Sequence, residues 1–108
     1  MIRLAGPVLR GRERQYIQEC LDGNQLSGGA LVERFERAFA EFCGARYAIA
    51  CSNGTAALHL ALAALGVEAG DEVIIPTLTF VATANAVTYC GARPVLVDVH
   101  PDYWGIDP

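Results

Sequence analysis

The feature that most restricts the fold of this chain is a change in the spacing of its hydrophobic residues near residue 45. Before that point apolar residues recur at helical intervals, whereas after it short continuous apolar runs alternate with longer apolar segments. Continuous runs of five or six apolar residues are typical of strands in a parallel sheet. The expected strands and helices of this part are, in order, 47–51, 55–65, 72–76, 80–89 and 94–99. Strand–helix–strand–helix–strand order gives two βαβ crossovers, so the sequence predicts an α/β fold with parallel strands.

The part before residue 45 predicts two helices, over 11–21 and 30–43. In the second helix the apolar residues form one stripe while charged residues lie off it, and Gly44 follows as a C-terminal cap. The stripe consists of Leu31, Phe35, Phe39 and Phe42. We therefore divide residues 1–108 into N-terminal helices, 1–45, and a βαβαβ part, 46–108.

The chain is unusually apolar for its size. Hydrophobic residues make up 53% and charged residues 19% of its 108 residues, against about 25% charged in average proteins. Small domains have proportionally more surface and should be less apolar. Segment 55–65 is apolar almost all round, so we expect it to be buried on every side. The excess indicates surface that meets the rest of a longer chain or a second subunit.

The end of the sequence, Asp107-Pro108, has the pattern of a helix start, with Asp as N-cap and Pro in the first turn. We expect a helix to begin there, and therefore expect this chain to be a fragment, which leaves a truncated gene product or a non-catalytic interaction module as one interpretation.

Charge and composition make several partners and sites poor candidates. The net charge is −4 and there is no basic run, so nucleic acid is not expected as a partner. No segment has the length of a signal peptide or a membrane span, so we expect no membrane partner and a cytoplasmic location. The four cysteines lack a C-x-x-C pair and are expected to be reduced thiols rather than metal ligands.

Residues 52–57, Ser-Asn-Gly-Thr-Ala-Ala, lie between an expected strand and an expected helix. The first amides of a helix have no partner within it, and the helix dipole adds positive charge there. Gly54 allows close approach, Thr55 offers a hydroxyl and Ala56 an unhindered amide, so this turn is a candidate phosphate site. The alternative is that Ser52 or Asn53 only caps a core helix. The spacing matches neither the P-loop nor the dinucleotide glycine pattern.

Residues 76–83 follow the next expected strand and contain one aromatic residue, Phe80. They fall at the same end of the sheet as the candidate phosphate turn, where ligands of open α/β sheets bind. Phe80 is therefore a candidate for stacking on a flat heterocycle. Ordinary core packing is the alternative for an isolated phenylalanine.

Two stretches together resemble one protein family. SNGTAALHLALAALGVEAGDEVIIPTLTFVATANAVTYCGARPVLVDV and LSGGALVERFERAFAEFCGARYAIACSNGT are similar to the N-terminal part of the DegT/DnrJ/EryC1/StrS aminotransferases. The resemblance covers nearly the whole chain but only about the first third of a family member. It implies the N-terminal portion of a fold-type I large domain, with a parallel or mixed sheet and flanking helices. It also implies pyridoxal 5'-phosphate (PLP) as cofactor and amination of nucleotide-linked keto-sugars.

The resemblance assigns roles to individual residues. Gly54, Thr55 and Ala56 match the turn that holds the cofactor phosphate, and Phe80 matches the aromatic residue that stacks on the pyridine ring. Asp98 matches an aspartate at a strand end, to which we assign no catalytic role. Two further features are weaker: residues 27–29 match a loop near the substrate entrance, or are a plain flexible turn, and His59 matches a packing position.

Lysine is absent, and all eight basic residues are arginine. The family's Schiff-base lysine and the acid that pairs with the pyridine nitrogen would lie beyond residue 108. We therefore expect no catalytic residue in this chain, and no transaminase turnover by it alone. The resemblance implies a nucleotide-sugar substrate, an amino-acid amino donor and a homodimer for the intact enzyme. A sugar 3-dehydratase of the same family, which uses pyridoxamine phosphate, remains an open alternative.

Overall fold

The structure, a computed structural model, describes residues 6–107. It contains four helices and two strands within these residues. In chain order they are α1 (Glu13–Asp22), α2 (Ala30–Cys43), α3 (Gly54–Ala64), β1 (Glu72–Pro76), α4 (Ala82–Tyr89) and β2 (Arg93–Val97). They fall into two compact units, with the boundary between Ala50 and Cys51 in the sequence. The helix start expected at Asp107-Pro108 involves a residue outside the described range.

The first unit consists of α1, α2 and their connections. Gly44, in the left-handed region with φ 63°, ends α2 as the sequence predicts. Glu36 on α2 accepts a hydrogen bond from the Ala50 amide through Oε1 at 2.8 Å, which ties residues 45–50 back to the helix. Ala40 is the only buried hydrophobic residue among the described residues of this unit. The amphipathic stripe of α2 therefore has no core to pack into here, and Phe42 is 88% exposed.

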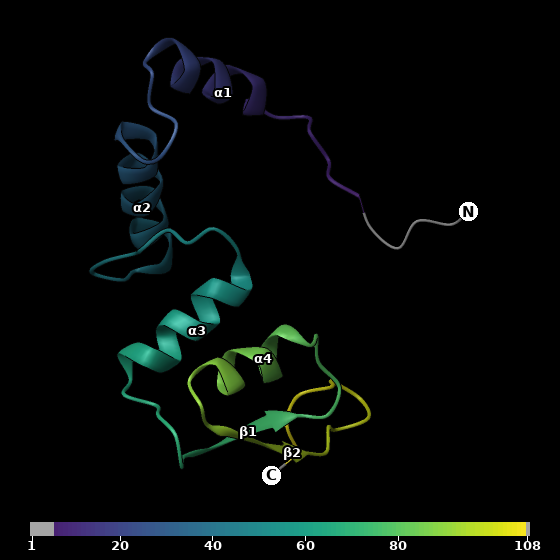
Figure 1. Ribbon diagram of the computed structural model, residues 1–108. Helices are drawn as coiled ribbons and strands as arrows, with labels where there is room; N and C mark the ends of the chain where they lie inside the picture. Colours follow the sequence, from purple (N-terminus) through teal and green to yellow (C-terminus); the bar gives the residue numbers. More distant parts are fainter. Residues whose placement is uncertain (1–5, 108) are drawn as a thin grey trace. The chain divides into compact units, whose positions relative to one another are not determined.

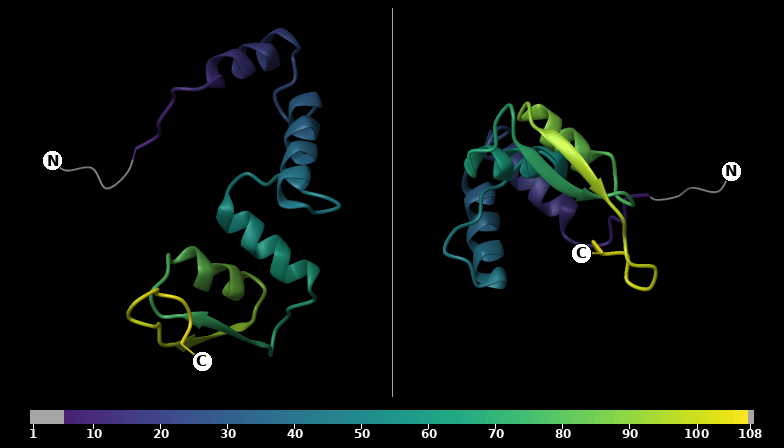
Figure 2. Two further views of the ribbon diagram at one scale, coloured as in Figure 1. Left: turned by 180° about the vertical axis from the view of Figure 1, so that it is seen from behind. Right: turned by 90° about the horizontal axis from the view of Figure 1, so that it is seen from below.

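The second unit is built on one βαβ crossover. β1 and β2 pair in parallel, with Ile75 opposite Leu96, and α4 connects them (Figure 1). Helix α4 contacts both strands, and α3 packs against α4. Both helices lie behind the two strands when this unit is seen from below (Figure 2).

The core of this unit lies between α4 and the sheet. It is formed by three buried residues, Ile75, Val87 and Ala92. Five partly buried hydrophobic residues pack against them: Leu62, Val67, Val73, Ala84 and Cys90. Burial of Val87 stabilises α4 against the sheet, because the strands offer it an apolar surface.

Three expectations need correction. Residues 47–51 do not form a strand, because the sheet in the described residues contains only β1 and β2 and gives this segment no ladder to join. The described chain therefore completes one βαβ crossover, not two. Helix α3 has no fully buried residue, since α4 is the only element that covers it substantially. Its apolar faces remain largely open.

The remaining differences lie at element ends. Helix α4 begins at Ala82 instead of residue 80, because residues 77–81 form a turn in which Thr83 donates its amide to the Phe80 carbonyl at 3.0 Å. Strand β2 ends at Val97 instead of residue 99. Val99 instead forms an isolated antiparallel bridge to Ile106, which closes the loop that follows Asp98.

Candidate functional site

Helix α3 begins with a side-chain cap. Asn53 has an extended backbone, and its Oδ1 accepts a hydrogen bond from the Ala56 amide at 2.9 Å. The first hydrogen bond within the helix runs from the Ala57 amide to the Asn53 carbonyl at 3.1 Å. This is the N-cap arrangement that asparagine favours, because its short side chain reaches the third helical amide. The capping role considered for Asn53 from the sequence is confirmed.

The cap leaves two helix amides open. Neither the Gly54 nor the Thr55 amide donates a hydrogen bond to another described residue, and the Thr55 hydroxyl is also without such a partner. A Cβ built on Gly54 would meet no atom within 4 Å, so the space above this turn is open. Two amides and a hydroxyl at a helix N-terminus are the donor set that an anion uses.

A pocket of about 690 Å³ opens between the start of α3 and the turn before α4. Its lining contains no charged side chain; it consists of Asn53, Gly54, Thr55, Ala57, Leu58, Phe80, Ala82 and Thr83. Pockets of 300–1,000 Å³ with mostly apolar walls and a few polar groups are typical small-molecule sites. Phe80 is 77% exposed, so its ring is available to a ligand.

The turn between β1 and α4 places Phe80 in this pocket. The Thr77 amide donates to the Val97 carbonyl at 2.9 Å, which carries the sheet pairing one residue past β1. Thr79 and Thr83 then share a hydrogen bond between their hydroxyls at 2.9 Å across the turn. Phe80 lies between these two threonines in the sequence and is therefore held at the helix start rather than in the core.

The structure brings three of the four expected site residues together. Gly54, Thr55 and Phe80 line the same pocket, although 25 residues separate the last two along the chain. Ala56 lines a neighbouring hollow of about 360 Å³. Sequence reasoning gave no site role to Leu58, Ala82 or Thr83, which also line the pocket. For Thr83, its place three residues after Phe80, in the stretch 76–83 that follows an expected strand, was an available signal.

Comparison with known proteins decides the family. The sequence profile of the DegT/DnrJ/EryC1/StrS aminotransferase family matches residues 7–108. The chain belongs to this aminotransferase family.

The chain is similar to several named proteins and solved structures. The GDP-perosamine synthase of Caulobacter vibrioides is 55% identical over 107 residues, which cover 98% of this chain and 29% of that protein. The UDP-2-acetamido-2-deoxy-3-oxo-D-glucuronate aminotransferase of Pseudomonas aeruginosa is 48% identical over 92 residues, 85% of this chain and 26% of that protein. The chain therefore spans between a quarter and a third of the length of these relatives.

The solved structure of NtdA from Bacillus subtilis with its bound cofactor PMP has the same fold over this region. The TM-score is 0.83 at 40% identity, with 88% of this chain and 22% of that chain covered. The α/β fold is thus that of the PLP-dependent aminotransferases, as the resemblance implied.

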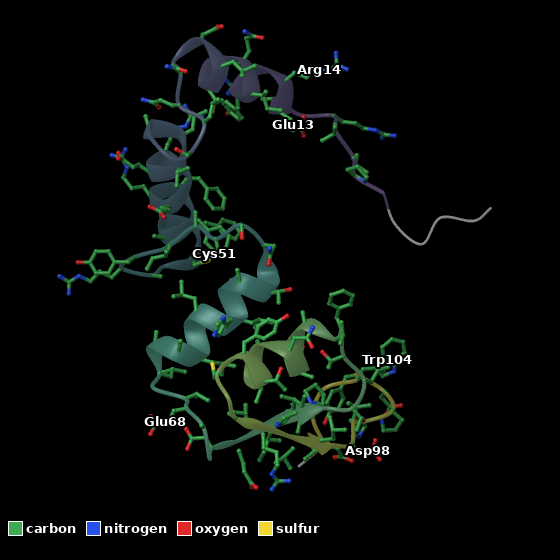
Figure 3. All side chains as sticks on the ribbon, viewed as in Figure 1. Glu13, Arg14, Cys51, Glu68, Asp98 and Trp104 are labelled. Atoms are coloured by element: carbon green, nitrogen blue, oxygen red, sulfur yellow. The ribbon has the colours of Figure 1, made fainter. Side chains whose placement is uncertain are left out.

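Other residues singled out from the sequence lie outside the pocket of this aminotransferase segment. Asp98 follows β2, and its Oδ1 accepts the Val99 amide at 2.9 Å (Figure 3). His59 packs edge-on against Tyr89, with ring centroids 5.6 Å apart, which agrees with a packing role. Residues 27–29 belong to the first unit, where Gly28 and Gly29 have φ of 130° and 100°, values that favour glycine.

Within residues 6–107, the part of the chain that the structure describes, no group of three or more histidine, cysteine, aspartate or glutamate side chains is placed to hold a metal ion. Within the same residues, no helix has the length and apolarity needed to cross a membrane.

Proposed function

We propose that this chain is the cofactor-cradling part of a PLP-dependent aminotransferase that transfers an amino group from an amino acid to a nucleotide-linked keto-sugar. The observation that carries the proposal is the pocket in which open helix amides and an exposed aromatic ring share one cavity. The names of the Caulobacter and Pseudomonas relatives, which contain a GDP-sugar and a UDP-linked oxo-sugar, support the substrate class.

The proposed cofactor fits the residues present. The phosphate of PLP would take the amides of Gly54 and Thr55 and the Thr55 hydroxyl, in the turn completed by Ala56, and its ring would stack on Phe80. The open space above Gly54 suits a group that approaches the backbone closely, since no side chain occupies it. The mostly apolar lining, with Leu58 and Phe80 in it, offers the ring an apolar surface. When bound, the cofactor supplies the electron sink for transamination.

The residues of this chain bind and orient; they do not supply the amine that the reaction needs. None of its 108 residues is lysine, and arginine cannot replace lysine because its guanidinium stays protonated. We therefore propose that the chain alone performs no transamination. The catalytic amine and the remaining substrate contacts would come from sequence that corresponds to the rest of its relatives.

A chimera tests this function. In it, the matching segment of the Caulobacter GDP-perosamine synthase is replaced by residues 7–108 of this chain. The chimera should bind PLP and aminate the relative's sugar nucleotide, because this segment supplies the phosphate turn and the stacking ring. Loss of PLP binding in a folded chimera would contradict the proposal. The matched variant Phe80→Leu should keep the fold and weaken PLP binding by about tenfold, as expected for loss of one aromatic contact.

The chain alone is the control for the role of lysine. It should show no amination of a keto-sugar nucleotide with PLP and an amino donor. Turnover by the purified chain would overturn the argument from the missing lysine.

We further propose a cytoplasmic homodimer for the intact enzyme. Cysteines without a disulfide-like spacing suit a reducing compartment. The exposed rings of Phe35, Phe39 and Phe42 favour an interface on α2. The same exposed rings also favour the second candidate function, a non-catalytic interaction module. Light scattering measures whether the chain associates with itself. A monomer at high concentration would count against both the interface on α2 and the interaction module.

A further inference from the structure

The cap of helix α3 is neutral, although an aspartate would cap the helix equally well. We propose that Asn53 is a positioning and charge-selecting residue of the phosphate turn. Its uncharged carboxamide holds the Ala56 amide and leaves the Gly54 and Thr55 amides to a phosphate dianion. This inference rests on the function proposed above. It adds a role for Asn53 and states which of the three amides binds the cap and which two bind the phosphate.

The geometry fixes which amide each partner takes. Asn53 Oδ1 accepts the Ala56 amide at 2.9 Å, while Asn53 Nδ2 donates to Ser52 Oγ at 3.3 Å. The two bonds use the opposite ends of the carboxamide, so they hold Oδ1 toward the helix. Ala56 lines a neighbouring hollow, which Asn53 and Thr55 also line, and is absent from the lining of the pocket that holds Gly54 and Phe80. Its amide is already occupied by Asn53 Oδ1.

The charge of the surroundings explains why the cap is neutral. No side chain that lines this pocket within residues 6–107 carries a charge, so what this chain offers a phosphate there is the helix N-terminus and hydrogen bonds. Asparagine and aspartate are equivalent N-caps, and the negative charge of an aspartate would also interact favourably with the helix dipole. An aspartate at residue 53 would, however, stand beside the dianion, where like charges repel.

Amide NMR of the chain tests this division. The probe is pyridoxine 5'-phosphate, which carries no aldehyde and cannot react with the N-terminal amine, and pyridoxine is its control without phosphate. Pyridoxine 5'-phosphate should shift the Gly54 and Thr55 amide resonances strongly and leave Ala56 nearly unchanged; pyridoxine should move none of the three. A shift of Ala56 equal to that of Thr55 would overturn the division of labour.

Three variants separate selection from capping. Asn53→Asp should keep the unfolding midpoint and weaken pyridoxine 5'-phosphate binding by about tenfold or more, because the added negative charge repels the phosphate. Asn53→Ser, a neutral cap, should keep the unfolding midpoint and change pyridoxine 5'-phosphate binding by no more than about threefold. Asn53→Ala should lower the unfolding midpoint and allow the Ala56 amide to respond to the phosphate.

If the wild-type amides of Gly54 and Thr55 do not respond, the proposed phosphate site is wrong, and the role of Asn53 is overturned with it. If they respond in the wild type and Asn53→Asp binds with equal affinity, the site stands and Asn53 is only a helix cap.

Discussion

The two units of this chain use apolar residues in opposite ways. In the unit that begins at Cys51, Ile75, Val87 and Ala92 form a core between one helix and a parallel pair of strands. In the unit that ends at Ala50, Phe35 and Phe39 contact each other, with centroids 5.7 Å apart, yet both rings stay exposed. The candidate pocket lies wholly within the unit that has a core.

This difference indicates which part of the chain specifies its own structure. A pocket needs walls fixed to within a fraction of an ångström. Here α3 supplies one wall, and α4 with the turn before it supplies the other. The first unit contributes helices whose apolar faces require a further surface. We therefore expect substitutions in the second unit to have large effects on stability, and comparable ones in the first unit to have small effects.

The largest effect should come from charge in the core. Ile75→Asp should destabilise the second unit by about 4 kcal/mol or more, because it buries an unpaired carboxylate at a position 3% exposed. Its neighbour Ile74 is 61% exposed, so Ile74→Asp should cost less than about 1 kcal/mol. Urea unfolding followed by Trp104 fluorescence measures both; equal effects would show that the core is not where the structure places it.

Truncation compares the two units directly. Val87→Ala should cost about 2 kcal/mol, since Val87 is 1% exposed and its removal leaves a cavity against Ile75. Phe42→Ala removes a larger side chain but should cost less than about 0.5 kcal/mol, because the ring is 88% exposed. Amide hydrogen exchange in α4 and α2 reads each unit separately. A larger effect at Phe42 would reveal a core in the first unit.

A pair of glycines sharpens the contrast within the second unit. Gly91→Ala should cost about 1 kcal/mol, because Gly91 has φ 77° and an added Cβ would lie 3.3 Å from Ala69 Cβ. Gly54→Ala should leave the thermal midpoint unchanged or slightly raised, since its φ is ordinary and its surroundings are open. Thermal unfolding by circular dichroism checks both; a fall at Gly54 would mean that the turn is already closely packed.

The smallest effect should come from the ion pair between Arg93 and Glu72 at the start of the sheet. Both side chains are more than half exposed, so water screens their attraction. Glu72→Gln should change stability by no more than about 0.5 kcal/mol, and less at high salt. A salt-independent loss above 1 kcal/mol would contradict this assignment.

Local sequence signals predicted much of the fold because the βαβ crossover is short and self-contained. The apolar run at Glu72–Pro76 became a strand with the expected ends, and Gly44 ended α2 as its cap. The strand expected at 47–51 did not form, because a strand depends on a neighbour that hydrophobicity alone cannot supply. The apolar faces of α3 stay open for a related reason. An apolar sequence indicates that a segment can be buried, but burial also requires another element that covers it.

The sequence predicted several of the residues that line the candidate site, but not the hydrogen bonds that they make. Gly54, Thr55 and Phe80 share a pocket because α3 packs against α4 and both turns lie at the N-terminal ends of these helices. The Ala56 amide donates a hydrogen bond to Asn53 Oδ1. This bond depends on one side-chain rotamer of Asn53, which the sequence does not specify. That bond divides the amides of the turn between the helix cap and the proposed ligand.

The most direct test of the central claim is a titration of the chain, with a blocked N-terminus, by PLP. We expect saturable binding without covalent attachment, and at least tenfold weaker binding in Gly54→Ala at an unchanged unfolding midpoint. Absence of saturable binding, or equal binding in Gly54→Ala, would contradict the claim that this turn cradles the cofactor phosphate.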